Sequence, residues 1–184
     1  MPYQTDAQNF GKPYSPKKLV LMALFVAVAL VLSYIERLIP LNFAIPGVKL
    51  GLANVVTCIA LYTFRPKDTL LIVLVRIFLV GIFIGSATSF LYSFAGGTLS
   101  FIGMLITLRL LKKYVSAIGV SVVGAFLHNL GQVIVLGIIT SSLSVALTYF
   151  PILILTGVIT GVVVGSSALL VFRYMKHFKL IQTR

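Results

Sequence analysis

The sequence predicts an all-α, polytopic membrane protein: one bundle of six transmembrane helices with both termini in the cytoplasm. Hydrophobic residues make up 59% of the 184 positions, and the mean hydropathy is +1.11, far above the composition of a soluble domain. Six apolar segments follow one another, with most positive charges on alternate connections between them. At about 20 residues per span, six helices leave no room for a separate aqueous domain.

Prolines, glycines and polar turns divide the chain into these segments. We expect a cytoplasmic tail over residues 1–18, a six-helix transmembrane domain over 19–175 and a basic cytoplasmic tail over 176–184. The apolar run after Lys17 and Lys18 is too long for a cleaved signal peptide, so it predicts the first helix. The helices are expected over residues 19–39, 50–64, 69–84, 90–111, 115 or 119 to 139, and 145–174.

Single residues mark several of these boundaries. Pro40 ends the first helix and opens an apolar outer loop over residues 40–49. Asp68 is the expected N-cap of the third helix. Pro151 either kinks the sixth helix or marks its first turn.

The charge pattern gives the orientation. The formal net charge is +12, but the basic residues lie at the ends of apolar segments, as in cytoplasmic loops next to anionic lipid headgroups. We therefore expect a bilayer as partner and no nucleic acid. With the N-terminus inside, twelve of the fifteen basic residues lie on the cytoplasmic side: Lys12, Lys17, Lys18, Arg65, Lys67, Arg109, Lys112, Lys113, Arg173, Lys176, Lys179 and Arg184.

Small residues form a stripe on the sixth helix. Gly157, Gly161 and Gly165 are spaced four residues apart, so another backbone can approach this face closely. Packing within the bundle and docking to another subunit both fit the stripe. Gly81 and Gly85 near the end of the third helix allow the same two interpretations.

Two charged residues in the apolar segments are candidates for a site. A charge at membrane depth costs at least about 2.5–3.5 kcal/mol on insertion scales and is rarely kept without a partner or a role. Arg76 lies about seven residues into the third helix, and Glu36 lies at the outer end of the first. They form either an ion pair that fixes helix packing or a site where Arg76 receives an anionic ligand group.

Uncharged polar residues extend this candidate site. His128 and Gln132 share a helix face, Asn129 lies beside them, and Asn54 lies near the outer end of the second helix. These groups describe a pocket for a polar organic molecule, or they bond to one another across helices. Three aromatic residues are candidates for stacking on a ligand, although aromatics at membrane interfaces are more often anchors: Tyr34, Tyr92 and Phe94.

Four motifs in order resemble a known family. They are LSYIE at residues 32–36, IPGVKLGLAN at 45–54, SFLYSFAGG at 89–97 and HNLGQ at 128–132. The chain is similar over about residues 18–175 to the membrane family called Gx transporters, whose members are often labelled heptaprenyl diphosphate synthase component I. The resemblance implies a fold similar to the substrate-binding S components of energy-coupling factor transporters. It further implies that Ala23 and Ala27 contact a transmembrane coupling subunit, with ATPase subunits as further partners.

The sequence argues against autonomous enzymatic activity. Prenyl diphosphate synthesis of the usual kind holds magnesium with paired aspartate-rich motifs, whereas Asp6, Glu36 and Asp68 lie far apart in the chain. The single Cys58 indicates no disulfide within the chain and no metal site. There is no Walker A motif, so ATP-driven work needs other subunits. We expect no cofactor.

Three functional hypotheses remain. The first is an integral membrane subunit that binds a small organic substrate from the outer side, with these residues in the pocket: Glu36, Asn54, Arg76, Tyr92, His128, Asn129 and Gln132. The second is a non-catalytic membrane subunit for polyprenyl (heptaprenyl) diphosphate or quinone biosynthesis. The third is a scaffold whose polar groups bond only to one another. All three place the chain in a bacterial cytoplasmic membrane.

Overall fold

The computed structural model describes residues 15–38, 51–83, 85–111 and 114–177. All regular secondary structure within these ranges is helical, in agreement with the predicted class. The helices are α1 (Pro16–Leu38), α2 (Asn54–Thr63), α3 (Pro66–Phe83), α4 (Ala87–Leu110), α5 (Ala117–Thr140) and α6 (Leu143–His177). The expected outer loop over 40–49, most of the N-terminal tail and the last residues of the C-terminal tail lie outside the described residues.

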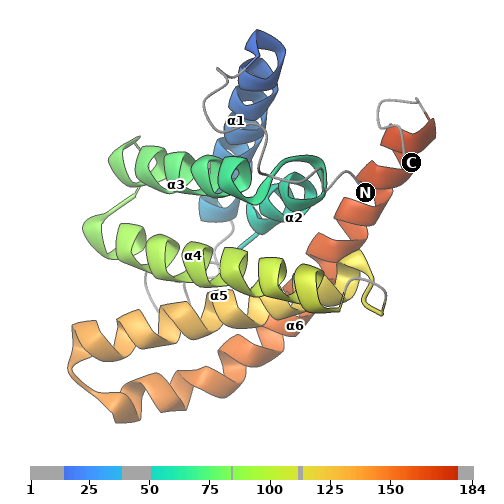
Figure 1. The fold of residues 1–184 in the computed structure, drawn as a ribbon. Helices are drawn as coiled ribbons and strands as arrows, with labels where there is room; N and C mark the ends of the chain where they lie inside the picture. The colour runs from blue at the N-terminus through green and yellow to red at the C-terminus, as the bar shows by residue number, and fades with distance from the viewer. Residues whose placement is uncertain (1–14, 39–50, 84, 112–113, 178–184) are drawn as a thin grey trace.

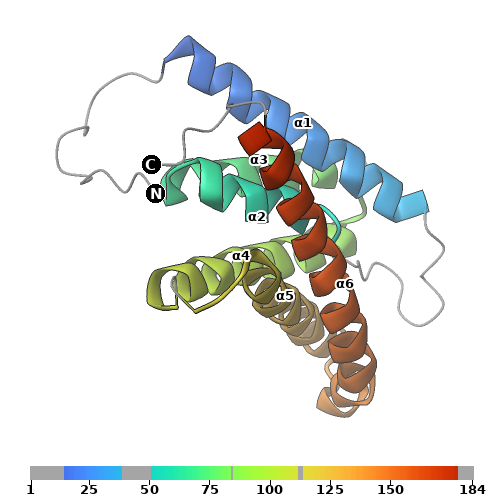
Figure 2. The same cartoon turned by 90° about the vertical axis from the view of Figure 1, so that its right-hand side faces the viewer.

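The helices pack in chain order, and the last one crosses back (Figure 1). α1 packs against α2 and α3, α3 against α4, and α4 against α5. α6 runs back along α5 and then reaches α2, which Figure 2 shows as a diagonal across the side of the bundle. Among the described helices, α1 contacts only α2 and α3, so it lies at the edge of the bundle.

Four of the six helices are long and apolar enough to cross a membrane, within the part of the chain that the structure describes: α1, α4, α5 and most of α6. The chain is therefore a multi-pass membrane protein. α2 has 10 residues, about 15 Å at 1.5 Å per residue, which is half of a hydrocarbon core. α3 has 18 residues, three of them charged. Of the six predicted spans, four therefore correspond to helices that are long and apolar enough to cross a membrane.

Helix starts are set by capping residues and one proline. α5 begins at Ala117, after Ser116, whose side chain accepts a hydrogen bond from the backbone N–H of Gly119. This start lies midway between the two predicted ones. α3 begins at Pro66, a residue that suits the first helical position. Asp68 is therefore inside the first turn of α3, and its expected role as N-cap is wrong. Pro151 lies within α6, not at its first turn.

The glycine stripe of α6 packs within the bundle. A Cβ added at Gly161 would lie 2.7 Å from Cα of Val122, and one at Gly165 would lie 2.5 Å from Cα of Ile118. Both neighbours are on α5, so the two backbones approach closely without side chains between them. Of the two interpretations of this stripe, packing within the chain is therefore confirmed.

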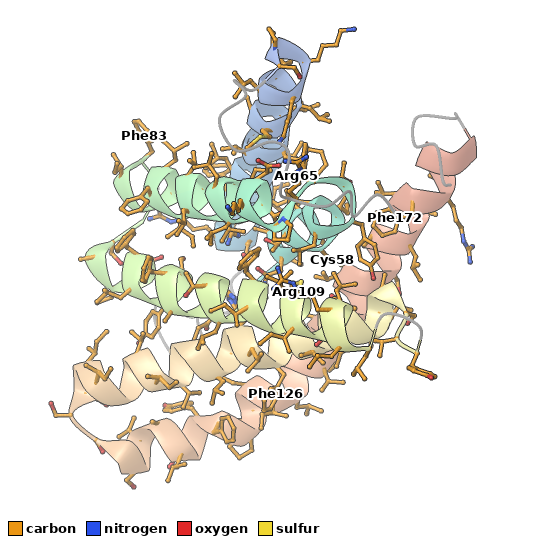
Figure 3. The ribbon with its side chains drawn as sticks, viewed as in Figure 1. Cys58, Arg65, Phe83, Arg109, Phe126 and Phe172 are labelled. Carbon is orange, nitrogen blue, oxygen red and sulfur yellow. The ribbon has the colours of Figure 1, made fainter. Side chains whose placement is uncertain are left out.

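Apolar clusters fill the remaining interior. The largest one includes Cys58, Val73 and Met104 from α2, α3 and α4. Phe172 of α6 packs on Tyr62 of α2 with ring centroids 4.9 Å apart. Figure 3 shows Cys58 inside the bundle and Phe83 pointing away from it at the end of α3. The exposure of Phe83, which is 77% exposed, fits a surface that faces lipid instead of water.

One end of α1 is held by an ion pair. Nζ of Lys18 lies 2.6 Å from Oδ2 of Asp68 in the first turn of α3. The Asp68 side chain is 3% exposed and that of Lys18 is 30% exposed. Asp68 is thus a second buried acidic residue in the helical bundle, in addition to Glu36. The sequence pattern did not show that Asp68 is buried there.

Candidate functional site

A small cavity lies where five segments of the chain meet. It is lined by Ser33 and Glu36 of α1, Gly51 before α2, Arg76, Ile77 and Val80 of α3, Ser93 of α4 and His128 of α5. Its inner volume is about 10 Å³, which is close to the space that one water molecule requires. Polar side chains from four helices thus converge on one small cavity.

Glu36 connects the end of α1 to the segment before α2. Its Oε1 accepts a hydrogen bond from the backbone N–H of Gly51. Gly51 has a φ of +82°, a left-handed conformation that glycine adopts at little cost. The Gly51 carbonyl in turn accepts from the backbone N–H of Asn54, the first residue of α2. The Glu36 carboxylate therefore lies one turn before the N-terminus of α2, where the helix dipole favours negative charge.

Arg76 brings a positive charge into the same cavity from the middle of α3. Its side chain is 6% exposed and interacts electrostatically with Glu36. A Cβ added at Gly97 would lie 3.2 Å from Nη2 of Arg76, so the guanidinium passes close to the α4 backbone. Nε of Arg76 has no hydrogen-bond acceptor among the described residues. A charged donor at this depth therefore keeps unused bonding capacity.

His128 closes the cavity from α5. A Cβ at Gly96 would lie 2.9 Å from Nδ1 of the imidazole, and one at Gly51 would lie 3.2 Å from its Cδ2. The imidazole is therefore held between α4 and the start of α2, in a gap that glycine leaves open on both sides. Asn54 lies beside it, with Nδ2 2.8 Å from the same Cβ position at Gly51. Its Oδ1 has no hydrogen-bond partner within the described part of the chain.

The structure thus brings four of the seven predicted site residues together: Glu36, Arg76 and His128 in the lining, with Asn54 next to Gly51. The other three lie elsewhere. Tyr92 packs in an apolar cluster with Val133 and Leu153. Asn129 donates to the Leu153 carbonyl of α6, so it joins helices. Gln132 is fully buried one turn after His128 and is not part of the lining.

The other aromatic candidates face outward. The Tyr34 and Phe94 side chains are 52% and 42% exposed, and neither belongs to the cavity lining. Their positions fit the alternative interpretation of membrane-facing aromatics.

Besides the apolar Ile77 and Val80, three lining residues were missed from the sequence: Ser33, Gly51 and Ser93. Ser33 lies three residues before Glu36 and therefore on the same helix face, so this spacing was a usable signal. Its Oγ donates to the Ala29 carbonyl, which leaves its lone pairs for an incoming donor. For Gly51 and Ser93 the sequence offered no signal beyond their place in the family motifs.

Carboxylates are separated in this fold. The helical stretch from Lys18, the partner of Asp68, to Glu36 is about 27 Å long at 1.5 Å per residue. Glu36 lies near one end of α1, and Asp68 of α3 lies beside the other end, so the two carboxylates cannot share a metal ion. Within the described ranges, no three His, Cys, Asp or Glu residues are grouped as metal ligands. The lining groups offer a ligand hydrogen bonds and charge pairing.

A second surface of interest is the outer face of α1. Ala23 and Ala27 are both exposed there, together with large apolar residues such as Leu24 and Val28, which are 56% and 45% exposed. Since the opposite face of α1 packs on α2 and α3, this face is available to lipid or to another membrane helix.

The fold and the cavity define a class: a multi-pass helical membrane protein with a polar, charge-containing site enclosed by its helices. Within that class, the family described as heptaprenyl diphosphate synthase component I matches residues 25–171. The chain belongs to this family. No curated protein sequence matches it.

A solved structure has a similar fold. It is described as "Structure and mechanism of the S component of a bacterial ECF transporter". The two chains are 20% identical, and the match covers 88% of this chain and 96% of the other with a TM-score of 0.66. The predicted likeness to S components is therefore confirmed at the level of the fold.

Proposed function

We propose that this chain is an integral membrane subunit that binds a small organic compound and supplies it to a transporter. The observation that carries the proposal is the polar cavity of Glu36, Arg76 and His128, enclosed in a fold shared with an S component. A scaffold would not need a buried guanidinium with an unused donor, because such a group destabilises the protein unless something binds it. No catalytic step is proposed for this chain.

The topology in this proposal follows the charges. We infer six spans with the N- and C-termini in the cytoplasm of a bacterium, since the basic residues gather at one side. This orientation places Glu36, and with it the cavity, toward the outer side of the membrane. Lys18 and Asp68 then lie at the cytoplasmic end of α1. A compound would enter from outside, as an uptake system requires.

Energy would come from partners. The exposed face of α1 around Ala23 and Ala27 is the proposed contact for a coupling subunit, which would bring ATPase subunits with it. Small residues at i and i+4 let a partner helix approach closely. Replacing both alanines with leucine should abolish co-purification of ATPase subunits, whereas Val163→Leu at an exposed position of α6 should not. Equal recovery with all variants would refute this contact.

Retention of the compound tests the site. The protein is purified in mild detergent and unfolded, and the released small molecules are identified by mass spectrometry. We expect a compound from the wild type and from Arg109→Ala, because Arg109 is an exposed residue at the end of α4. We expect at least about tenfold less from Arg76→Ala and from His128→Ala, each checked for folding by its elution profile. Full retention by both folded cavity variants would contradict the assignment.

The family description favours a second candidate, a non-catalytic membrane subunit for polyprenyl diphosphate or quinone biosynthesis. The two candidates differ in their partners. Recovery of a soluble prenyltransferase with the tagged chain, without an ATPase, would support the second candidate and count against the first. Recovery of an ATPase-containing complex would do the reverse.

A further inference from the structure

The Glu36 carboxylate occupies a position that is built for an anion. It accepts from the Gly51 N–H, one turn before a helix of 10 residues, where backbone donors and the helix dipole attract negative charge. Arg76 approaches the same cavity from α3. The N-terminus of α2 and the Arg76 guanidinium therefore both place positive potential at the Glu36 carboxylate.

The bonding of Arg76 is incomplete around this carboxylate. The guanidinium carries five N–H donors in a planar fork that suits an oxyanion with two oxygens. Its Nε has no acceptor in the described residues, and the side chain is more than nine-tenths buried. An unmade hydrogen bond from a buried charged donor is costly. An anion that approached Arg76 differently from Glu36 would recover this bond.

The cavity has no spare room for such an anion beside Glu36. Its volume of about 10 Å³ holds about one water molecule. Displacing the Glu36 side chain would open the position and keep the charge around Arg76 unchanged, because one anion replaces another. Glu36 can leave at moderate cost, since it lies in the last turn of α1 with the exposed residues Arg37 and Leu38 next to it.

We propose that the compound bound by this cavity is a small organic anion, whose carboxylate or phosphate takes the place of the Glu36 carboxylate at Arg76 and the Gly51 N–H. Glu36 is then a competitor that holds the empty site closed, and it is not a direct ligand of the compound. This inference rests on the proposed function and names the chemical class of its substrate. A neutral or cationic compound would instead leave Glu36 in place.

Chemical rescue tests this position directly. In the full-length Glu36→Ala variant, Arg76 loses its carboxylate partner, and thermal unfolding in detergent is followed with sodium acetate, inorganic phosphate or acetamide at equal ionic strength. We expect acetate or phosphate at about 50 mM to raise Tm by about 3 °C or more, as a bound ligand does. Acetamide has nearly the same shape without the charge, so it should have no effect.

Asp68→Ala is the matched control, because it removes the other buried carboxylate from the bundle. Its partner Lys18 is 30% exposed and reaches water, so acetate should not raise the Tm of this variant beyond the chloride effect. A rise of the same size in both variants would indicate a general salt effect and would overturn the proposal. A rise in Glu36→Ala that also persists after Arg76→Gln is added would overturn it as well.

Glu36→Gln keeps the test decisive if Glu36→Ala does not fold. Its uncharged side chain competes less well for Arg76, so we expect acetate or phosphate to bind at least about tenfold more tightly than to the wild type. Weaker binding than in the wild type would mean that Glu36 contacts the ligand, and would refute its role as competitor. The stronger of the two probes then indicates whether a carboxylate or a phosphate is the natural group.

The failure of this inference can be told apart from the failure of the proposed function. If the compound released from the wild type is neutral or cationic at pH 7 and still co-purifies with an ATPase complex, transport stands and the anion class is refuted. If acetate rescues Glu36→Ala and no ATPase complex is found, the anion site stands and the energy-coupled function fails.

Discussion

The two ends of α1 handle a buried carboxylate in different ways. Near its N-terminus, Lys18 and Asp68 form a direct ion pair, with Nζ of Lys18 2.6 Å from Oδ2 of Asp68, so each charge has a counter-charge. Near its C-terminus, Glu36 meets Arg76 and the Gly51 N–H in a cavity that also contains Ser33 and polar groups of α4 and α5. The first arrangement fixes the position of a helix, whereas the second leaves bonding capacity that a ligand can use.

The largest expected effect is at the Arg76 end. Replacing Arg76 with methionine removes the charge and keeps much of the volume, but leaves Glu36 buried without its cation. Breaking a buried pair in this way costs about 3–5 kcal/mol, which thermal unfolding in detergent should detect. Glu36→Gln combined with Arg76→Met should recover most of that loss, because neither charge is left alone.

This double-variant cycle measures how strongly the two residues are coupled. Purely additive losses would mean that Glu36 and Arg76 do not stabilise one another, and the contrast between the two ends of α1 would then have no energetic basis.

The next effect is at Gly51. A Cβ there would lie 2.8 Å from Nδ2 of Asn54 and 3.2 Å from Cδ2 of His128, on a backbone with φ of +82°. Gly51→Ala should therefore cost about 1–2 kcal/mol for the left-handed conformation alone. It should also lower ligand retention, because the N–H moves away from the position that the anion takes.

Gly137→Ala is the matched control in α5. A Cβ at Gly137 would lie 3.4 Å from Cβ of Ala146, an ordinary contact, and alanine favours a helix over glycine by up to about 1 kcal/mol. We expect an unchanged or higher Tm. A stable Gly51→Ala that keeps the ligand would show that the Gly51 N–H is dispensable.

A smaller effect is expected at the Lys18 end. Asp68→Asn should lower stability by about 1 kcal/mol or less, since its partner Lys18 is 30% exposed and solvent screens that charge. The loss should shrink in high salt, as it does for exposed charges, and retention of the bound compound should not change. Thermal unfolding at two salt concentrations, followed by mass spectrometry, checks both parts. A loss of the compound in this variant would make both ends of α1 part of one site.

The sequence predicted the class of fold because apolar length and charge placement are one-dimensional properties. It also indicated an anion for Arg76, either Glu36 or a ligand group, since a charge at membrane depth is rarely kept without a partner. The rotation of most helices was harder to predict, because the lipid-facing and core-facing sides are both apolar and only α6 has a clear stripe, its glycines. Asn129 therefore looked like a site residue beside His128. Consecutive residues on a helix point about 100° apart. Asn129 therefore points away from the direction of His128 and donates to the Leu153 carbonyl of α6.

The predicted start of the second helix was wrong for a local reason. The second helix was expected from residue 50, but the left-handed Gly51 and the turn after it delay α2 to Asn54. This delay creates the backbone N–H that Glu36 accepts from. A turn conformation that depends on φ is invisible to a hydropathy pattern, so the part of the site made by the backbone could not be predicted.

The smallest effect on stability is expected at Ser33. The Ser33→Ala variant also separates the two ends of α1 most clearly, because it should change ligand affinity without changing stability. The Oγ of Ser33 donates only to the Ala29 carbonyl one turn earlier in the same helix, so Ser33→Ala should change the free energy of unfolding by about 0.5 kcal/mol or less. Its lone pairs face the cavity, however, and a lost hydrogen bond to a ligand is worth about 0.5–1.5 kcal/mol, or about a two- to twelvefold weaker affinity. Affinity measured for the compound that the wild type releases should therefore fall while Tm stays constant. An unchanged affinity in Ser33→Ala would remove the clearest difference between the two ends of α1.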